Sequence, residues 1–119
     1  MESWDGTELY YTRNDTRWPV LYSRPIGGGT ERQIATGVMP LSVFPTHEGI
    51  YYASFDPKTL PATEIRFLSF ASAKITTLYR FESIGSGGPL SVTPDGKTIV
   101  YSGVNPSKND DLMLVQNFR

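Results

Sequence analysis

Apolar and polar residues alternate along short segments of the chain with a period of two residues, not the 3.6 of a helix. Residues 8–12, 50–54 and 98–102 show this alternation, and each segment follows a short polar turn. Because successive side chains point to opposite faces of a strand, each segment places an aliphatic residue and a tyrosine on one face. These pairs are Leu9 and Tyr11, Ile50 and Tyr52, and Ile99 and Tyr101. We predict three equivalent β-strands here, and fewer than about a tenth of the residues in helix.

A six-residue sequence occurs twice in the chain. Pro40-Leu41-Ser42-Val43-Phe44-Pro45 returns 49 residues later as Pro89-Leu90-Ser91-Val92-Thr93-Pro94, with five of the six positions identical. The glycines of the turns before the three alternating segments, Gly6, Gly49 and Gly96, are 43 and 47 residues apart. A repeat of forty to fifty residues that contains several strands is typical of a β-propeller.

The two copies of this sequence predict equivalent inner strands. Alternation places Leu41 and Val43 on a buried face, with Ser42 on the opposite face, and the second copy repeats this with Leu90, Val92 and Ser91. The turn after the second copy contains Asp95-Gly96, in which glycine accepts a positive φ without steric cost. The turn after the first copy, residues 46–49, lacks Asp-Gly, and we interpret it as two residues longer.

The complete repeat is a four-stranded antiparallel meander, which is the blade of a propeller. We divide the chain into blade one at residues 5–37, blade two at 38–84 and blade three at 85–119. Blade one is expected to lack its innermost strand and blade three to end after its third, which leaves ten strands. The fold class is therefore all-β, a partial β-propeller of about two and a half blades. Because propellers need about four to eight blades to close, we expect either part of a longer protein or a chain that assembles with further copies.

Composition narrows the class of protein. The 119 residues suffice for one domain, and 13% of them are aromatic, which favours sheet. Eleven basic and twelve acidic residues give a net charge of −1 without a basic cluster, which argues against nucleic-acid binding. The chain has no cysteine, which suits the cytoplasm and a bacterial periplasm equally. No apolar run approaches the ~20 residues of a membrane span, so we expect no membrane insertion, and the first residues do not resemble a signal peptide.

The chemistry of the side chains predicts no catalytic, cofactor or metal site. His47 is the only histidine, and no Gly-x-Ser-x-Gly sequence provides a nucleophile, so we interpret His47 as a solvated turn residue. Gly27-Gly28-Gly29-Thr30 lacks the Lys-Ser/Thr and the following helix of a phosphate-binding loop, and we interpret it as a hairpin turn. Asn109-Asp110-Asp111 lacks the ligand spacing of a calcium loop.

Three long polar loops are the candidate partner surface. They follow the three equivalent strands, so they are expected on one side of the propeller. Trp18 beside Arg17 has the composition of a binding hot spot; alternatively, Trp18 covers the edge of its blade. The predicted partner-binding residues in these loops are Arg17, Trp18, Asp56, Lys58, Asn105 and Lys108.

The turn Pro94-Asp95-Gly96-Lys97 and the closing sequence at residues 111–119, Asp-Leu-Met-Leu-Val-Gln-Asn-Phe-Arg, resemble the end of a bacterial TolB-like, WD-repeat-like β-propeller. The hallmark of that family is a turn of the Ser-Pro-Asp-Gly type. This chain departs from it at Trp4, which stands in the proline position of the first turn. The ending is also similar to that of bacterial regulators that carry such a propeller behind a winged-helix or Ser/Thr kinase domain. The 119 residues contain neither domain, so those activities do not transfer to this chain.

These observations predict a non-catalytic propeller segment that acts as a protein-interaction or ligand-sensing module of a larger bacterial protein. The partner, a protein or a small ligand, is expected on the face of the long loops. One alternative is the gating propeller of a prolyl-oligopeptidase-like hydrolase, whose catalytic domain would lie elsewhere in the protein. Another is a small carbohydrate-binding propeller that uses Trp4, Trp18 and Tyr51. As an isolated chain we expect a homo-oligomer, because unfinished blade edges leave backbone groups unpaired.

Overall fold

The computed structural model describes residues 1–14, 18–56, 58, 62–81, 87–105 and 110–116, with the backbone alone for 87, 88, 102–105 and 110–116. The described residues form β-strands and turns and contain no helix. The strands are β1 (Glu8–Arg13), β2 (Val20–Pro25), β3 (Arg32–Thr36), β4 (Val38–Pro45), β5 (Gly49–Ser54), β6 (Thr63–Ser69), β7 (Ile75–Phe81), β8 (Gly87–Val92), β9 (Thr98–Asn105) and β10 (Asp110–Gln116). The predictions of an all-β fold and of strands at residues 8–12, 50–54 and 98–102 are confirmed.

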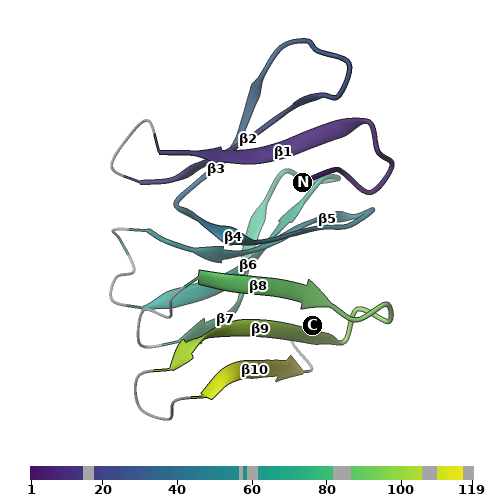
Figure 1. Cartoon of the computed structure of the whole chain (residues 1–119). Coiled ribbons are helices and arrows are strands. Elements are labelled where there is room, and N and C mark those ends of the chain that lie inside the picture. Colours follow the sequence, from purple (N-terminus) through teal and green to yellow (C-terminus); the bar gives the residue numbers. More distant parts are fainter. Residues whose placement is uncertain (15–17, 57, 59–61, 82–86, 106–109, 117–119) are drawn as a thin grey trace.

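The strands form three antiparallel sheets that follow one another along the chain. The first sheet has the order β1-β2-β3, the second β4-β5-β6-β7 and the third β8-β9-β10. Within each sheet, every strand pairs with the next one in sequence, so each sheet is a meander. Figure 1 shows the three sheets stacked in this order, from purple to yellow. The second and third sheets meet mainly where β4 lies beside β8.

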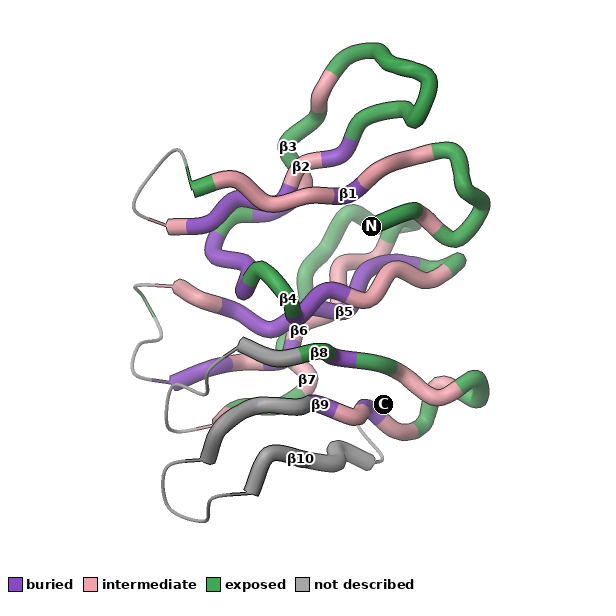
Figure 2. The backbone as a smooth tube through the Cα atoms, viewed as in Figure 1, coloured by how far each residue is buried: buried purple, intermediate pink, exposed green. Residues whose placement is uncertain are grey.

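Two hydrophobic clusters hold the sheets together, and β5 contributes to both. Ile50 and Tyr52 belong to the cluster with the first sheet, whereas Tyr51 and Ala53 belong to the cluster with the third. This follows from the alternation of side chains along a strand. All six residues of β5 are buried, which Figure 2 shows as a purple strand in the middle of the molecule. The first cluster is completed by Tyr10, Leu21, Ala35, Val38 and Val43, and the second by Met39, Ile65, Leu90, Ile99 and Tyr101.

The prediction that the two copies of the Pro-Leu-Ser-Val sequence are equivalent is wrong. Val43 pairs with Tyr52, and Leu90 pairs with Tyr101, so the structural counterpart of Leu90 is Val43 and not Leu41. Leu41 is 68% exposed and Ser42 is buried, whereas Leu90 is buried and Ser91 is exposed. The register of β4 shifts between Val38 and Val43, and a bulge of this kind changes which side chains point inward.

The length of the turn between β4 and β5 explains why the counterpart of Leu90 is Val43 and not Leu41. In this turn, Thr46 N donates a hydrogen bond to the Gly49 carbonyl at 2.7 Å. In the turn between β8 and β9, Thr93 N donates a hydrogen bond to the Thr98 carbonyl at 2.9 Å. The β4–β5 turn is therefore two residues shorter than its counterpart, and the prediction that it is longer is wrong.

Residues 1–3 take the position of an inner strand beside β1. Glu2 forms an isolated antiparallel bridge with Leu9. The Met1 ammonium donates to the Tyr10 carbonyl at 2.9 Å, and Tyr10 N donates to the Met1 carbonyl at 2.6 Å. The first sheet thus has the three predicted strands together with a short segment in the place that β4 occupies beside β5.

Candidate binding site

The connections between strands leave the sheets at two opposite ends. The long-loop face is the end where β1, β5 and β9 finish and β2, β6 and β10 begin (Figure 1). The short-turn face is the end with the turns at residues 3–7, 46–48 and 93–97, which lead into β1, β5 and β9. The predicted partner residues belong to the long-loop face.

Trp18 packs against the neighbouring sheet. Its ring centroid lies 5.1 Å from that of Phe55, which follows β5, and the side chain is partly buried. Trp18 therefore covers the junction between the first and second sheets, which corresponds to the alternative considered for it in the sequence.

Asp56 is engaged within the chain, and Lys58 is exposed. Asp56 accepts a hydrogen bond from Lys58 N at 2.9 Å and forms an ion pair with Arg66 at 3.2 Å. The backbone hydrogen bond from Lys58, together with Arg66, holds the pKa of Asp56 below its ordinary value. Arg17, Lys108 and the side chain of Asn105 lie outside the described residues, so partner binding on this face stays a prediction.

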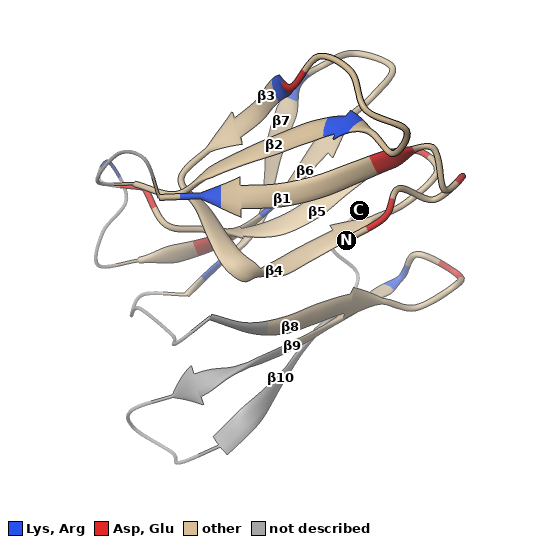
Figure 3. Ribbon diagram, turned by 45° about the horizontal axis from the view of Figure 1, so that its top comes forward, with Lys and Arg blue, Asp and Glu red and all other residues tan. Residues whose placement is uncertain are grey.

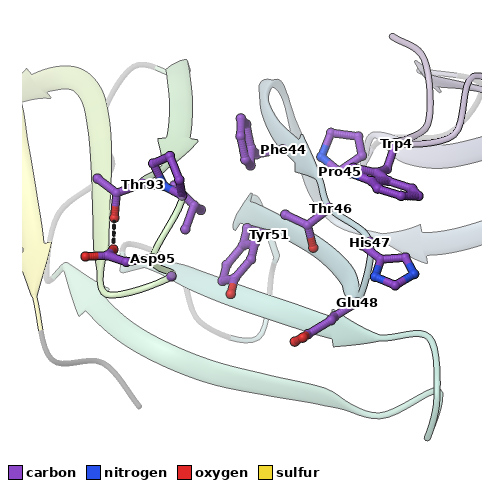
Figure 4. A pocket seen from close by; sticks show the side chains of 12 residues that line it. Trp4, Phe44, Pro45, Thr46, His47, Glu48, Tyr51, Thr93 and Asp95 are labelled. Carbon is purple, nitrogen blue, oxygen red and sulfur yellow. Dashed lines mark hydrogen bonds between the residues drawn. The ribbon is translucent and has the colours of Figure 1, made fainter.

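A pocket of about 440 Å³ opens on the short-turn face between the second and third sheets (Figure 4). Phe44, Tyr51 and His47 come from the second sheet and its turn, and Trp4 reaches the pocket from the turn before β1. Two carboxylates, Glu48 and Asp95, lie on either side of Tyr51 in Figure 4. The pocket is thus lined by aromatic rings and bordered by acidic side chains.

The turns at residues 3–7 and 93–97 have the same construction, which fixes the position of their central residues. Gly6 and Gly96 have φ of 74° and 70°, a conformation that glycine adopts without strain. In the first turn, Asp5 Oδ1 accepts from Thr7 Oγ1 at 2.7 Å, from Ser3 Oγ at 2.7 Å and from Thr7 N at 3.1 Å. These hydrogen bonds, with that of the Thr7 side chain as the largest cause, lower the pKa of Asp5 to about 2.

The turn before β9 repeats these contacts. Asp95 Oδ1 accepts from Thr93 Oγ1 at 2.6 Å and from Lys97 N at 3.0 Å, and these bonds lower the pKa of Asp95. Both aspartates are therefore ionised at neutral pH. Trp4 and Pro94 occupy corresponding positions in the two turns, so Trp4 is held by a defined backbone although its side chain is 67% exposed.

Trp4 lies against His47, with ring centroids 4.6 Å apart and an angle of 37° between the planes. Both rings also line a second pocket of about 260 Å³, between the first and second sheets, which contains Asp5 and Glu8. Glu8 Oε1 is 3.6 Å from Arg32, whereas Glu8 Oε2 is buried and has no hydrogen-bond partner among the described residues. Two acidic residues line each pocket, and neither pocket has a lysine or arginine among its described lining residues.

The sequence assigned no binding role to His47 and gave Trp4 one only in the carbohydrate alternative. His47 is exposed, as its turn position predicted, but the sequence did not predict its contact with Trp4. The one signal that could have indicated the site is Trp4 itself, because a large aromatic residue replaces the proline of the turn. In the described part of the chain, no three His, Cys, Asp or Glu side chains are grouped so that they could hold a metal ion. The same residues include no helix that could span a membrane.

Comparison with known proteins identifies the fold. No family model matches the chain, and no curated protein sequence matches it. Among solved structures, TolB from Acinetobacter baumannii superposes on 98% of the chain with a TM-score of 0.73 and 16% sequence identity. The chain has a TolB-like fold. The TolB-like part of the predicted resemblance is confirmed, and the WD-repeat and regulator parts stay predictions. The chain covers 28% of the length of that TolB, so the likeness extends over a part of a propeller and concerns the fold alone.

Proposed function

We propose that this chain is a non-catalytic binding module of a larger propeller protein, and that its short-turn face holds a segment of a partner protein. The observation that carries the proposal is the pocket of about 440 Å³ lined by Trp4, Phe44, His47 and Tyr51. Concave sites with aromatic walls and a few polar groups are the usual form of a binding site. Exposed tryptophan is also enriched among residues that dominate the energy of protein interfaces.

The short-turn face suits a partner better than the described part of the long-loop face. Trp18 contacts Phe55, and Asp56 is paired with Arg66, so both side chains already have structural contacts within the chain. Trp4 has its ring contact with His47 but remains 67% exposed, and it stands on a turn fixed by hydrogen bonds. An exposed ring on a rigid support loses little conformational entropy on binding.

The carbohydrate alternative fits this arrangement less well. Trp4 and Tyr51 line the same pocket, but Trp18 packs on Phe55 near the opposite end of β5. Tyr51 is only 2% exposed, so its ring cannot provide a stacking platform for a sugar. The gating-propeller alternative depends on a catalytic domain outside these 119 residues. Peptidase or esterase turnover by this chain that disappears in His47→Ala would contradict a non-catalytic role.

Selection from a displayed library of random linear peptides tests the proposal. The wild-type chain is the target, and each selected peptide is then measured by isothermal calorimetry against wild type, Trp4→Ala and Lys58→Ala. Trp4→Ala removes an exposed ring of the short-turn face, and Lys58→Ala is the matched change of an exposed residue on the long-loop face.

We expect selected peptides to bind wild type and Lys58→Ala equally and to lose about tenfold or more in affinity for Trp4→Ala, as a hot-spot residue would. Peptides that bind all three proteins equally, or that lose affinity only for Lys58→Ala, would contradict the short-turn face as the binding surface. Unchanged thermal unfolding of the variants ensures that affinity and folding are separated.

A further inference from the structure

The inner edge of the first sheet is only partly occupied. In the second and third sheets, β4 and β8 take the inner position beside β5 and β9. Beside β1 the same position holds residues 1–3, which pair as far as Tyr10. The end of β1 from Tyr11 to Arg13, which we call the open edge, has no strand on this side among the described residues. Figure 2 shows the consequence for burial, since β5 is purple and β1 is mainly pink.

The backbone of Thr12 is unpaired on this side. In an antiparallel strand, the N–H and C=O groups of every second residue point to the same neighbouring strand. The Glu8 carbonyl accepts a hydrogen bond from Ser3 N at 2.8 Å, and Tyr10 exchanges two hydrogen bonds with Met1. Thr12 is the next residue in this series, and on this side it has no backbone partner in the described part of the chain. Unpaired groups at a sheet edge are what an additional strand binds.

A pocket of about 280 Å³ lies beside the open edge. Its walls come from residues 1–3, β1, β2 and β4, and they include Leu21, Leu41 and Val43. Leu41 is 68% exposed and Met1 is 56% exposed, so the pocket has an apolar rim that faces solvent. Figure 3 shows that β1 and β4 have charged residues only at the two ends of β1. Exposed apolar surface beside an unpaired strand indicates an interaction site.

The two other sheets indicate which side chain this pocket takes. Val43 of β4 pairs with Tyr52, and Leu90 of β8 pairs with Tyr101. All four of these side chains are buried. Tyr11 is the residue of β1 that corresponds to the two tyrosines, yet it is only partly buried. An aliphatic side chain opposite Tyr11 would therefore give the first sheet the packing that the other two sheets have.

We propose that the open edge of β1 binds an extended segment of a partner protein as an additional antiparallel strand. The backbone of the segment pairs with Thr12, and one aliphatic side chain lies opposite Tyr11, in the pocket beside Leu41. Strand addition takes its affinity from main-chain hydrogen bonds and its specificity from pockets for alternate side chains. Because residues 1–3 fill the rest of the position, the segment ends or turns away beside Met1. The inference goes beyond the proposed function, because this pocket shares no described lining residue with the pocket of about 440 Å³.

Titration with short peptides tests the inference. The probe is the tetrapeptide Thr-Ser-Thr-Leu, acetylated and amidated, whose leucine would lie opposite Tyr11 and whose third residue would pair with Thr12. Binding is followed by NMR of the ¹⁵N-labelled chain, together with the hydrogen exchange of the Thr12 amide. We expect the probe to shift the Thr12 signal and to slow this exchange. A peptide with glycine in place of leucine, and one with an N-methylated third residue, should each bind about tenfold more weakly.

Variants of exposed apolar residues locate the binding. Leu41→Ser removes a wall of the pocket and should weaken binding of the probe several-fold. Ile75→Ser is the matched control, because Ile75 is 49% exposed on β7, the outer strand of the second sheet. This variant should bind the probe as wild type does. Trp4→Ala should also bind the probe normally, since Trp4 does not line this pocket.

Equal binding of the three peptides, or a Thr12 signal that none of them moves, would overturn the inference. Shifts confined to β7 would also overturn it, because they would place the added strand on the outer edge of the second sheet. Self-association that protects the Thr12 amide, and that the probe does not displace, would assign the surface to a second copy of the chain and contradict a partner segment. None of these results would affect the short-turn face, which is tested separately through Trp4.

Discussion

At the scale of single residues, two aspartates give the short-turn face its form. Asp5 and Asp95 each accept a hydroxyl hydrogen bond from the residue two positions earlier and a backbone hydrogen bond from the residue two positions later. The sequence predicted tight turns here from Asp-Gly, because glycine permits a positive φ. It did not predict that Ser3 and Thr93 complete the turns, since their role depends on side-chain rotamers.

Removing the largest support of the Asp5 carboxylate should raise its pKa. In Thr7→Ala we expect the pKa of Asp5 to move from about 2 toward its ordinary value of 3.8, because the Thr7 hydroxyl is the main cause of the shift. The pH dependence of the Asp5 carboxyl carbon signal in NMR measures this.

Because the folded pKa is depressed, the stability that Asp5 contributes is fully present above about pH 3.8 and is lost as the pH falls through about 2. Thr7→Ala should narrow the pH range over which this stability is lost, whereas Thr76→Ala, on exposed β7, should leave it unchanged. An unchanged pKa of Asp5 in Thr7→Ala would show that the Thr7 hydroxyl is not the main cause of the shift.

Asp56 should behave as a structural residue. Asp56→Ala removes one of the carboxylates paired with Arg66, whose side chain is 13% exposed, and the acceptor of the Lys58 backbone N–H. We expect a loss of about 1–2 kcal/mol in the free energy of unfolding, measured by urea denaturation. Glu64 still pairs with Arg66 at 2.7 Å in this variant, which keeps the loss moderate. Stability equal to wild type would show that the ion pair is unimportant and would leave Asp56 available for the predicted partner role.

At the scale of elements, the sequence predicted strands well and their register poorly. Alternation identified β1, β5 and β9, because the period of two is a local property of the chain. The register of β4 depends on a bulge between Val38 and Val43 and on a turn that is two residues shorter than its counterpart. Both arise from pairing with β5, so a comparison of sequence copies could not reveal that Leu41 points outward and Ser42 inward.

Gly49 is the position in β5 where the sheet has no room for a side chain. A Cβ placed there would lie 2.1 Å from the Leu68 carbonyl oxygen and 2.6 Å from the Phe67 ring. We expect Gly49→Ala to lower the free energy of unfolding by about 2–3 kcal/mol, as overpacked core positions do. Gly27→Ala is the matched control, because a Cβ there meets nothing within 4 Å. Equal stability of the two variants in chemical denaturation would show that the pairing of β5 with β6 is looser than described.

At the scale of the whole molecule, the repeat predicted the fold, whereas the site could not be predicted. A repeat of forty to fifty residues predicted stacked sheets of a partial β-propeller, and the TolB-like fold confirms this fold class. The site depends on Trp4 and His47, which are 43 residues apart in the sequence and come from different sheets. Their contact follows from how the first and second sheets stack, which no local pattern encodes.

The isolated chain is expected to associate with itself. Leu9 and Tyr11 are only partly buried in β1. Their counterparts Ile50 and Tyr52 are buried between the first and second sheets, and Ile99 and Tyr101 between the second and third. Leu41 is also largely exposed. We expect a homo-oligomer, most simply a dimer that buries more than about 1,600 Å². Light scattering at micromolar concentration measures the mass, and a stable monomer of 13.3 kDa would contradict this prediction.

The most direct test of the account is to find which face a partner touches. A peptide selected for binding is titrated into the ¹⁵N-labelled chain, and backbone amide shifts are followed by NMR. We predict that the largest changes occur at Trp4, His47 and Gly96, in the three turns of the short-turn face. Changes confined to Trp18, Phe55 and Lys58, with the turn signals unmoved, would instead place the partner on the long-loop face and contradict the central claim.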